Sequence, residues 1–292
     1  MAKYVSALIL AAFCAALVST GRANAQTSVS QAASRMTGDF ENFADDVQLD
    51  LEDISTSPLY ITSPNSILRS PRFYLELAGA GAVWGGSYAL DQTMHARFRD
   101  LPNSAHDVME NFSYVCLISG VSLLYLYGLD RDEPKLRSYM LTGMEGAGMG
   151  VLFNLAVEAV FGRLRPVQSS SHTAFFRKVG NFNASSFTSE DMVITSAMAT
   201  GISEYFDNAW YVAVPAYSLM LTEGFTRLKN QNWVSDVIGG ALLGWATTEM
   251  LLYLHKRHQQ EPDRWRIFPV SAPPGPASQT HASLGLGINY SW

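Results

Sequence analysis

The sequence predicts an all-α fold, with a bundle of about six helices at its centre. Two observations support this. Apolar residues make up 48% of the 292 residues and charged residues only 16%, so the chain can bury one large core. Long apolar segments with helical spacing, too long for typical strands, also follow one another between residues 71 and 258. We expect the helices at about 73–97, 105–129, 134–161, 188–206, 208–228 and 234–258.

The first 25 residues have the pattern of a secretory signal peptide. Lys3 precedes an apolar stretch from Val5 to Val18, and Ala23-Asn24-Ala25 has the small residues typical of a cleavage site before Gln26. We therefore expect an exported protein that lies in the periplasm or the cell envelope. Cleavage would leave Cys116 as the one cysteine, so no internal disulfide is expected.

Two polar regions flank the predicted bundle. Residues 26–70 are acidic and turn-rich, and we expect one or two short helices there that serve as a lid or an anchor at most. Residues 259–292 combine a Pro-containing linker with a final stretch, 284–290, that alternates apolar residues with Gly and Asn. This period of two predicts a short β-hairpin or strand at the C-terminus. The helical domain itself is expected to cover residues 71–258.

The apolar segments leave two arrangements open. Residues 111–129 contain no charged side chain and are long enough to span a bilayer, whereas neighbouring segments carry Glu76, Glu145 or Glu249. The bundle is therefore either soluble or integral to a membrane, and in both cases we expect it to associate with one. The net charge of −6 argues against a nucleic-acid partner.

Three short stretches place cations, carboxylates and small residues near the expected helix ends. They are GRLRP at 162–166, SSFTSED at 185–191 and TRLKNQNWVSDVIGG at 226–240. Taken alone, the first is explained by cations at a helix C-terminus followed by a proline that ends the helix. The order and separation of all three indicate a common site.

Together these stretches resemble the motifs of the type 2 phosphatidic acid phosphatase and vanadium haloperoxidase superfamily, over about residues 75–255. Its members carry Lys, six residues and Arg-Pro, then Pro-Ser-Gly-His, then Ser-Arg, five residues, His, three residues and Asp. The resemblance implies a helical bundle with a phosphate site near helix ends. It also implies that cations and the second motif hold phosphate, that one His attacks phosphorus while an Asp orients it, and that the other His protonates the leaving oxygen.

The phosphate-binding positions are only partly retained. Arg165 matches the first motif, but Glu158 stands at the position of its Lys. Ser189 of the second motif is kept, and Glu190 replaces its Gly. Arg227 of the third motif is kept as well. Two of the expected cations therefore remain, together with two added carboxylates.

The catalytic positions have changed further. Asp191 stands at the His of the second motif, and Asp236 keeps the Asp of the third. With a one-residue deletion after Arg227, the nucleophilic His falls on Asn232. Asparagine has no basic lone pair for attack on phosphorus, so the resemblance implies that the covalent route is closed.

These changes favour a degenerate, non-catalytic protein of this fold, with a structural or binding role at the cell envelope. We expect carboxylates to neutralise the two arginines, because buried arginines without their anion need such partners. The ligand would be a lipid or a phosphorylated envelope molecule, and neither a cofactor nor a metal is expected. Two alternatives stay open. One is a membrane-surface phosphatase or phosphotransferase acting on lipid phosphates, with His172 as a candidate base, and the other is a divalent-cation site of the new carboxylates and Asn232.

Overall fold

The computed structural model describes residues 25–56, 71–99, 103–177, 179–180, 185–229, 231–260, 265–271 and 284–290. The elements are the helices α2 (Ala25–Thr56), α3 (Pro71–Phe98), α4 (Asn103–Asp130), α5 (Pro134–Phe161), α6 (Glu190–Tyr205), α7 (Trp210–Arg227) and α8 (Val234–Gln260), and the strands β1 (Trp265–Ser271) and β2 (Leu284–Tyr290). The chain divides into two compact units, Met1–Thr248 and Glu249–Trp292, which are described separately.

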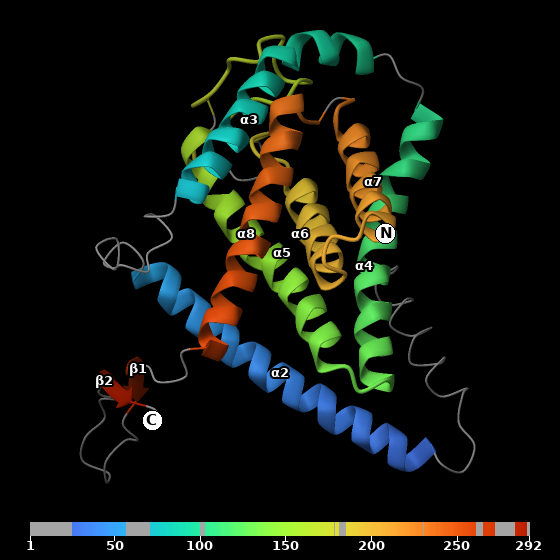
Figure 1. Ribbon diagram of the computed structural model, residues 1–292. Coiled ribbons are helices and arrows are strands. Elements are labelled where there is room, and N and C mark those ends of the chain that lie inside the picture. Colours follow the sequence, from blue (N-terminus) through green and yellow to red (C-terminus); the bar gives the residue numbers. More distant parts are fainter. Residues whose placement is uncertain are drawn as a thin grey trace, which may run out of the picture. The chain divides into compact units, whose positions relative to one another are not determined.

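The six helices predicted for the central domain are confirmed as α3 to α8 (Figure 1). Their ends follow local chemistry. Pro134 lies in the first turn of α5, where its missing N–H costs nothing. The same helix ends at Gly162, whose φ of 42° is in the left-handed region that glycine adopts most easily.

The core of the first unit lies between α4, α5, α6 and α7. Leu117, Val121, Met140, Met192 and Ala197 are each at most 1% exposed and belong to one apolar cluster. Small residues let α5 and α6 approach closely. A Cβ atom on Gly201 would lie 2.9 Å from the Cα atom of Gly143, so a larger residue there would push the two helices apart.

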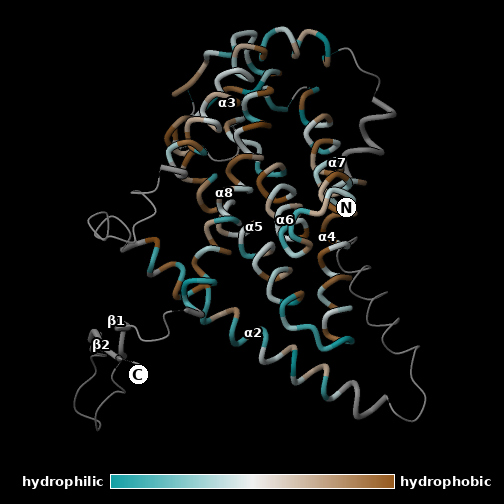
Figure 2. The backbone as a smooth tube through the Cα atoms, viewed as in Figure 1, coloured by the Kyte–Doolittle hydropathy of each residue, from teal (hydrophilic) through white to brown (hydrophobic). Residues whose placement is uncertain are grey.

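The N-terminal region differs from the prediction, because residues 25–56 form one helix of 32 residues rather than one or two short helices. Figure 2 shows hydrophilic and hydrophobic residues alternating along this helix, α2. Tertiary contacts stabilise it. Asp39 accepts hydrogen bonds from Arg137 Nε at 2.8 Å and from the Tyr125 hydroxyl at 3.0 Å. Arg35 Nη1 donates to the Leu129 carbonyl at 3.0 Å. The predicted signal peptide falls almost wholly on residues 1–24, outside the described residues.

The second unit contains the end of α8 and a β-hairpin. Strand β1 pairs with β2 in antiparallel register, with Trp265 opposite Tyr290 and Ile267 opposite Ile288. The predicted strand at the C-terminus is therefore β2 of this hairpin, and the predicted linker falls partly on residues 272–283, outside the described residues.

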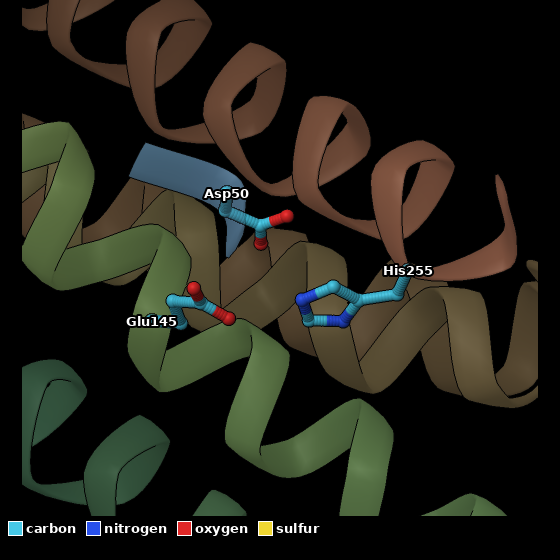
Figure 3. Close-up of side chains that lie close together, drawn as sticks. All are labelled: Asp50, Glu145 and His255. Atoms are coloured by element: carbon cyan, nitrogen blue, oxygen red, sulfur yellow. The ribbon is translucent and has the colours of Figure 1, made fainter. Parts of the chain in front are cut away.

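Three stretches within the described helices are long and apolar enough to cross a membrane: Phe112–Asp130, Pro134–Phe161 and Val234–His258. This finding supports the membrane association expected from the sequence. The second stretch contains Glu145, which is buried and has a carboxylate oxygen within 4.8 Å of one from Asp50 on α2 (Figure 3). An acidic residue in this stretch is therefore packed against protein.

Candidate functional site

The three motifs meet where the loop after α5 contacts the start of α6 and the turn between α7 and α8. Leu164 and Ser185 form an isolated antiparallel β-bridge, which joins the first motif to the second. The Trp233 indole donates to the Leu164 carbonyl at 2.9 Å, and the Ser189 N–H donates to the Asp236 carbonyl at 3.0 Å. These bonds join the third motif to the other two, so the structure brings together the stretches that the sequence singles out.

Arg163 is a fully buried charge of this region. Its guanidinium forms ion pairs with Asp236 and with Asp91, whose Oδ2 atom lies 2.6 Å from Arg163 Nη2, and all three side chains are 0% exposed. It also donates to Ser235 Oγ at 2.8 Å and to the His172 carbonyl at 2.6 and 3.0 Å. Arg163 therefore holds the first turn of α8, the loop after α5 and helix α3 in contact.

Aromatic rings surround the same guanidinium. The Cζ atom of Arg163 lies 4.6 Å from the ring centroid of Phe175, 5.3 Å from that of Trp233 and 5.5 Å from that of Tyr88. Cation–π contacts strengthen when they are desolvated, as they are here. Tyr88 and Asp91 lie three residues apart on α3, and this spacing explains how one helix face supplies both a ring and a carboxylate.

Arg227 has two carboxylate partners, one on its own helix and one on α6. Glu223 Oε1, one turn earlier on α7, lies 2.7 Å from Arg227 Nη2, and Asp191 Oδ2 at the start of α6 lies 3.2 Å from Arg227 Nε. Gln231 Oε1 accepts a further bond at 3.0 Å. Glu223 is 0% exposed and accepts a hydrogen bond from Ser113 on α4, whereas the side chain of Asp191 is 36% exposed. A carboxylate at a motif position therefore pairs with Arg227, as the expected neutralisation of the arginines requires.

Arg165, unlike Arg227, is bonded to a backbone carbonyl and not to a carboxylate of the described residues. Its Nε atom donates to the Ser185 carbonyl at 3.4 Å, and no carboxylate of the described residues forms an ion pair with it. Glu158, which was expected to pair with an arginine, instead accepts a hydrogen bond from Asn154 Nδ2 at 3.1 Å. The Asn154 carbonyl oxygen in turn accepts from the Thr188 hydroxyl. Carboxylates therefore form the expected ion pairs with Arg227, whereas among the described residues none forms an ion pair with Arg165.

Asn232 and Asp236 stand where the resemblance implies the nucleophilic His and the Asp that orients it, but each bonds to other groups. Asn232 Nδ2 donates to the Ser186 carbonyl at 2.7 Å. Asp236 accepts from the Trp233 N–H at 3.0 Å through Oδ2, and its Oδ1 atom pairs with Arg163. Asp236 thus anchors a structural arginine and caps the first turn of α8.

The start of α6 carries the remaining predicted site residues. Ser189 is buried, and its Oγ atom has no hydrogen-bond partner among the described residues. Glu190 and Asp191 form the first turn of α6, where the helix dipole favours negative charge. Partial burial and the neighbouring Asp191 charge raise the pKa of Glu190. Two carboxylates therefore occupy the helix end that would otherwise attract a phosphate.

Sequence reasoning missed Asp91 and Glu223. Asp91 lies in α3, outside all three motifs. The sequence hints at its role only by placing an acid on the helix face that also carries Tyr88. Glu223 stands four residues before Arg227, and this spacing is typical of an ion pair within a helix. It could have been found from the sequence, whereas the partner of Asp91 could not.

The family model of the PAP2 superfamily matches residues 141–260. Comparison with curated proteins gives no match. Among solved structures, the crystal structure of the first transmembrane PAP2 type phosphatidylglycerolphosphate phosphatase from Bacillus subtilis is 18% identical and has a TM-score of 0.41, covering 66% of this chain and 96% of that chain. The matched residues 141–260 contain all three motifs, so over this region the chain is similar to the PAP2 superfamily.

Proposed function

We propose that this chain is an exported PAP2-fold protein of the cell envelope that no longer hydrolyses phosphate esters. One observation carries the proposal: Arg227, a matched phosphate-binding cation, is paired with Glu223 and Asp191. The site is thus closed by its own carboxylates. Its role is structural, or it binds a lipid or phosphorylated ligand without turnover.

The chemistry at the nucleophile position supports this proposal. A covalent phosphoryl transfer needs a basic lone pair aimed at phosphorus. The amide nitrogen of Asn232 has none, and it donates its proton to the Ser186 carbonyl. The ring of His172 packs against Tyr88 and Trp233, at centroid distances of 5.0 and 6.3 Å. This packing does not support His172 as a base in place of the missing nucleophile.

The charges around the site also oppose a phosphate dianion. Stabilising a phosphoryl group requires fixed cations around its equatorial oxygens. Here no carboxylate of the described residues forms an ion pair with Arg165, although Glu158 lies near enough to interact with its charge. Glu190 and Asp191 place two further carboxyl groups at the start of α6. Releasing Arg227 for phosphate would leave the fully buried Glu223 without its counter-ion, which is strongly unfavourable.

A phosphatase assay on the purified protein tests the proposal. We expect no release of phosphate from phosphatidate or from a soluble aryl phosphate above the level of an Arg165→Ala variant. A double variant, Asn232→His with Asp191→His, should also stay inactive, because Glu158 and Glu190 still oppose phosphate. Turnover by the wild type that disappears in both Arg165→Ala and Arg227→Ala would instead establish the phosphatase alternative.

A further inference from the structure

One side of helix α2 is docked on the bundle. Asp39 is bonded to Arg137, Phe43 packs against the apolar cluster, and Asp50 is fully buried. Asp39, Phe43 and Asp50 are separated by four and then seven positions, so they lie on one face of the helix. This face fixes α2 on the bundle and leaves other sides of the helix exposed (Figure 1).

An apolar row of exposed residues runs beside the docked face. Met36, Phe40 and Leu51 are all exposed. Their separations of four and eleven positions are close to whole helical turns, so the three side chains form one row about 22 Å long. Contiguous exposed apolar residues of this kind mark interaction surfaces.

An acidic row runs along the outer edge of the apolar row. Glu41 and Asp45 follow Phe40 by one and five positions, which places them about 100° and 140° further around the helix. Both are exposed, and neither forms an ion pair with another described residue. Like charges four residues apart repel each other on a helix, so a cationic partner would relieve this repulsion.

The charge of α2 distinguishes between the possible occupants of the two rows. Ala25–Thr56 contains one basic residue, Arg35, which pairs with Asp132 at 3.1 Å. Its acidic residues are Asp39, Glu41, Asp45, Asp46, Asp50, Glu52 and Asp53. Helices that lie on membrane surfaces carry Lys and Arg on their polar side, which α2 does not. A second copy of α2 would bring the same negative charge to the contact, and like charges across an interface disfavour it.

We propose that the outer side of α2, formed by Met36, Phe40, Glu41, Asp45 and Leu51, is the docking surface for a basic amphipathic helix of another protein. The apolar face of the partner helix packs on the apolar row, as in other complexes in which an amphipathic helix binds a hydrophobic surface. Its Lys and Arg side chains pair with Glu41 and Asp45. None of these five residues belongs to the three motifs, so the proposal is independent of the phosphate site.

Binding of a synthetic peptide tests the proposal. The full chain is purified in uncharged maltoside micelles. The probe is an amphipathic helical peptide of leucine and lysine, about 18 residues or about 27 Å long, and a peptide of leucine and glutamate with the same pattern is its control. Fluorescence anisotropy of the labelled peptide gives the dissociation constant after subtraction of binding to empty micelles. Hydrogen exchange followed by mass spectrometry locates the contact.

We expect saturable binding of the basic peptide, no binding of the acidic peptide, and slower exchange at residues 36–51. Asp45→Lys should weaken binding about fivefold, the factor that corresponds to the ~1 kcal/mol of an exposed ion pair. Phe40→Ser should weaken it as well, because it interrupts the apolar row. Glu76→Lys, at an exposed acid on α3, is the charge-matched control and should leave the dissociation constant unchanged.

Three results would overturn the proposal. Equal weakening by Asp45→Lys and Glu76→Lys would mean that the peptide responds to net charge alone. Equal binding of the basic and the acidic peptide would mean that the surface takes apolar partners of either charge. Slower exchange at residues 36–51 in phosphatidylcholine vesicles than in micelles, without peptide, would make a bilayer the occupant of this side of α2.

Discussion

Asp91 Oδ2 lies 2.6 Å from Arg163 Nη2, and neither side chain is exposed to solvent. This pair connects α3 to the loop that carries the first motif, although α3 lies outside the matched residues 141–260. Asp91 also accepts hydrogen bonds from the backbone N–H and the hydroxyl of Ser235, so one carboxylate positions both the first and the third motif. The frame of the site therefore depends on a residue that none of the motifs contains.

The first prediction concerns Asp91→Ala. Removing this carboxylate leaves Arg163 with Asp236 alone and leaves the Ser235 N–H without its acceptor. Breaking one side of a buried ion pair costs about 3–5 kcal/mol, and we expect a loss of this size in the free energy of unfolding. Chemical denaturation followed by circular dichroism measures it. Asp130→Ala, at an aspartate whose side chain is 82% exposed, is the matched control and should be close to neutral. Equal stability of the two variants would contradict the structural role of Asp91.

The second prediction separates the two carboxylates that pair with Arg227. Glu223 is fully buried and bonded to Ser113, whereas Asp191 is 36% exposed. Glu223→Gln should therefore lower the melting temperature clearly, and Asp191→Asn should lower it little, because exposed pairs are worth at most about 1 kcal/mol. Thermal unfolding of the two variants under the same conditions measures the difference. The reverse order would mean that Asp191, and not Glu223, is the main partner of Arg227.

How far the sequence could predict this site depends on which partners lie near in the chain. The six central helices follow from apolar spacing, and the motifs could be aligned because each is local. A carboxylate partner was predicted for the two motif arginines, and Asp191 is such a partner of Arg227, since both occupy motif positions. The Asp91–Arg163 pair joins residues 72 positions apart, and no local pattern indicates it. The length of α2 was underestimated for the same reason, because the residues that stabilise it, such as Arg137, lie on other helices.

The third prediction concerns phosphate itself. A ligand that binds only the folded state raises the melting temperature by mass action. Because Arg227 is already paired, millimolar phosphate or vanadate should leave the melting temperature of the wild type unchanged relative to the same concentration of chloride. Asp191→Asn removes the more exposed carboxylate and should allow a small, saturable rise. A saturable rise in the wild type that is lost in Arg165→Ala would show that the site is open.

The fourth prediction concerns pH and His95, whose ring packs against Trp233 at a centroid distance of 5.3 Å. Burial, and to a lesser extent the charge of Arg99, lower the pKa of His95 from 6.5. The unfolded chain therefore binds a proton at a higher pH than the folded chain does. Stability from this group is fully present above about pH 6.5 and is lost as the pH falls through the lowered folded-state pKa.

Replacing the imidazole with a ring that does not titrate should remove this contribution and keep the contact with Trp233. We expect His95→Phe to lose less stability than the wild type when the pH is lowered from about 7.5 to about 5, a range in which histidine titrates. Denaturant unfolding at several pH values gives both curves, and their difference isolates His95 from the other histidines, which are the same in both proteins. Parallel curves would show that the folded protein binds the His95 proton as readily as the unfolded chain, and that packing on Trp233 does not disfavour the imidazolium.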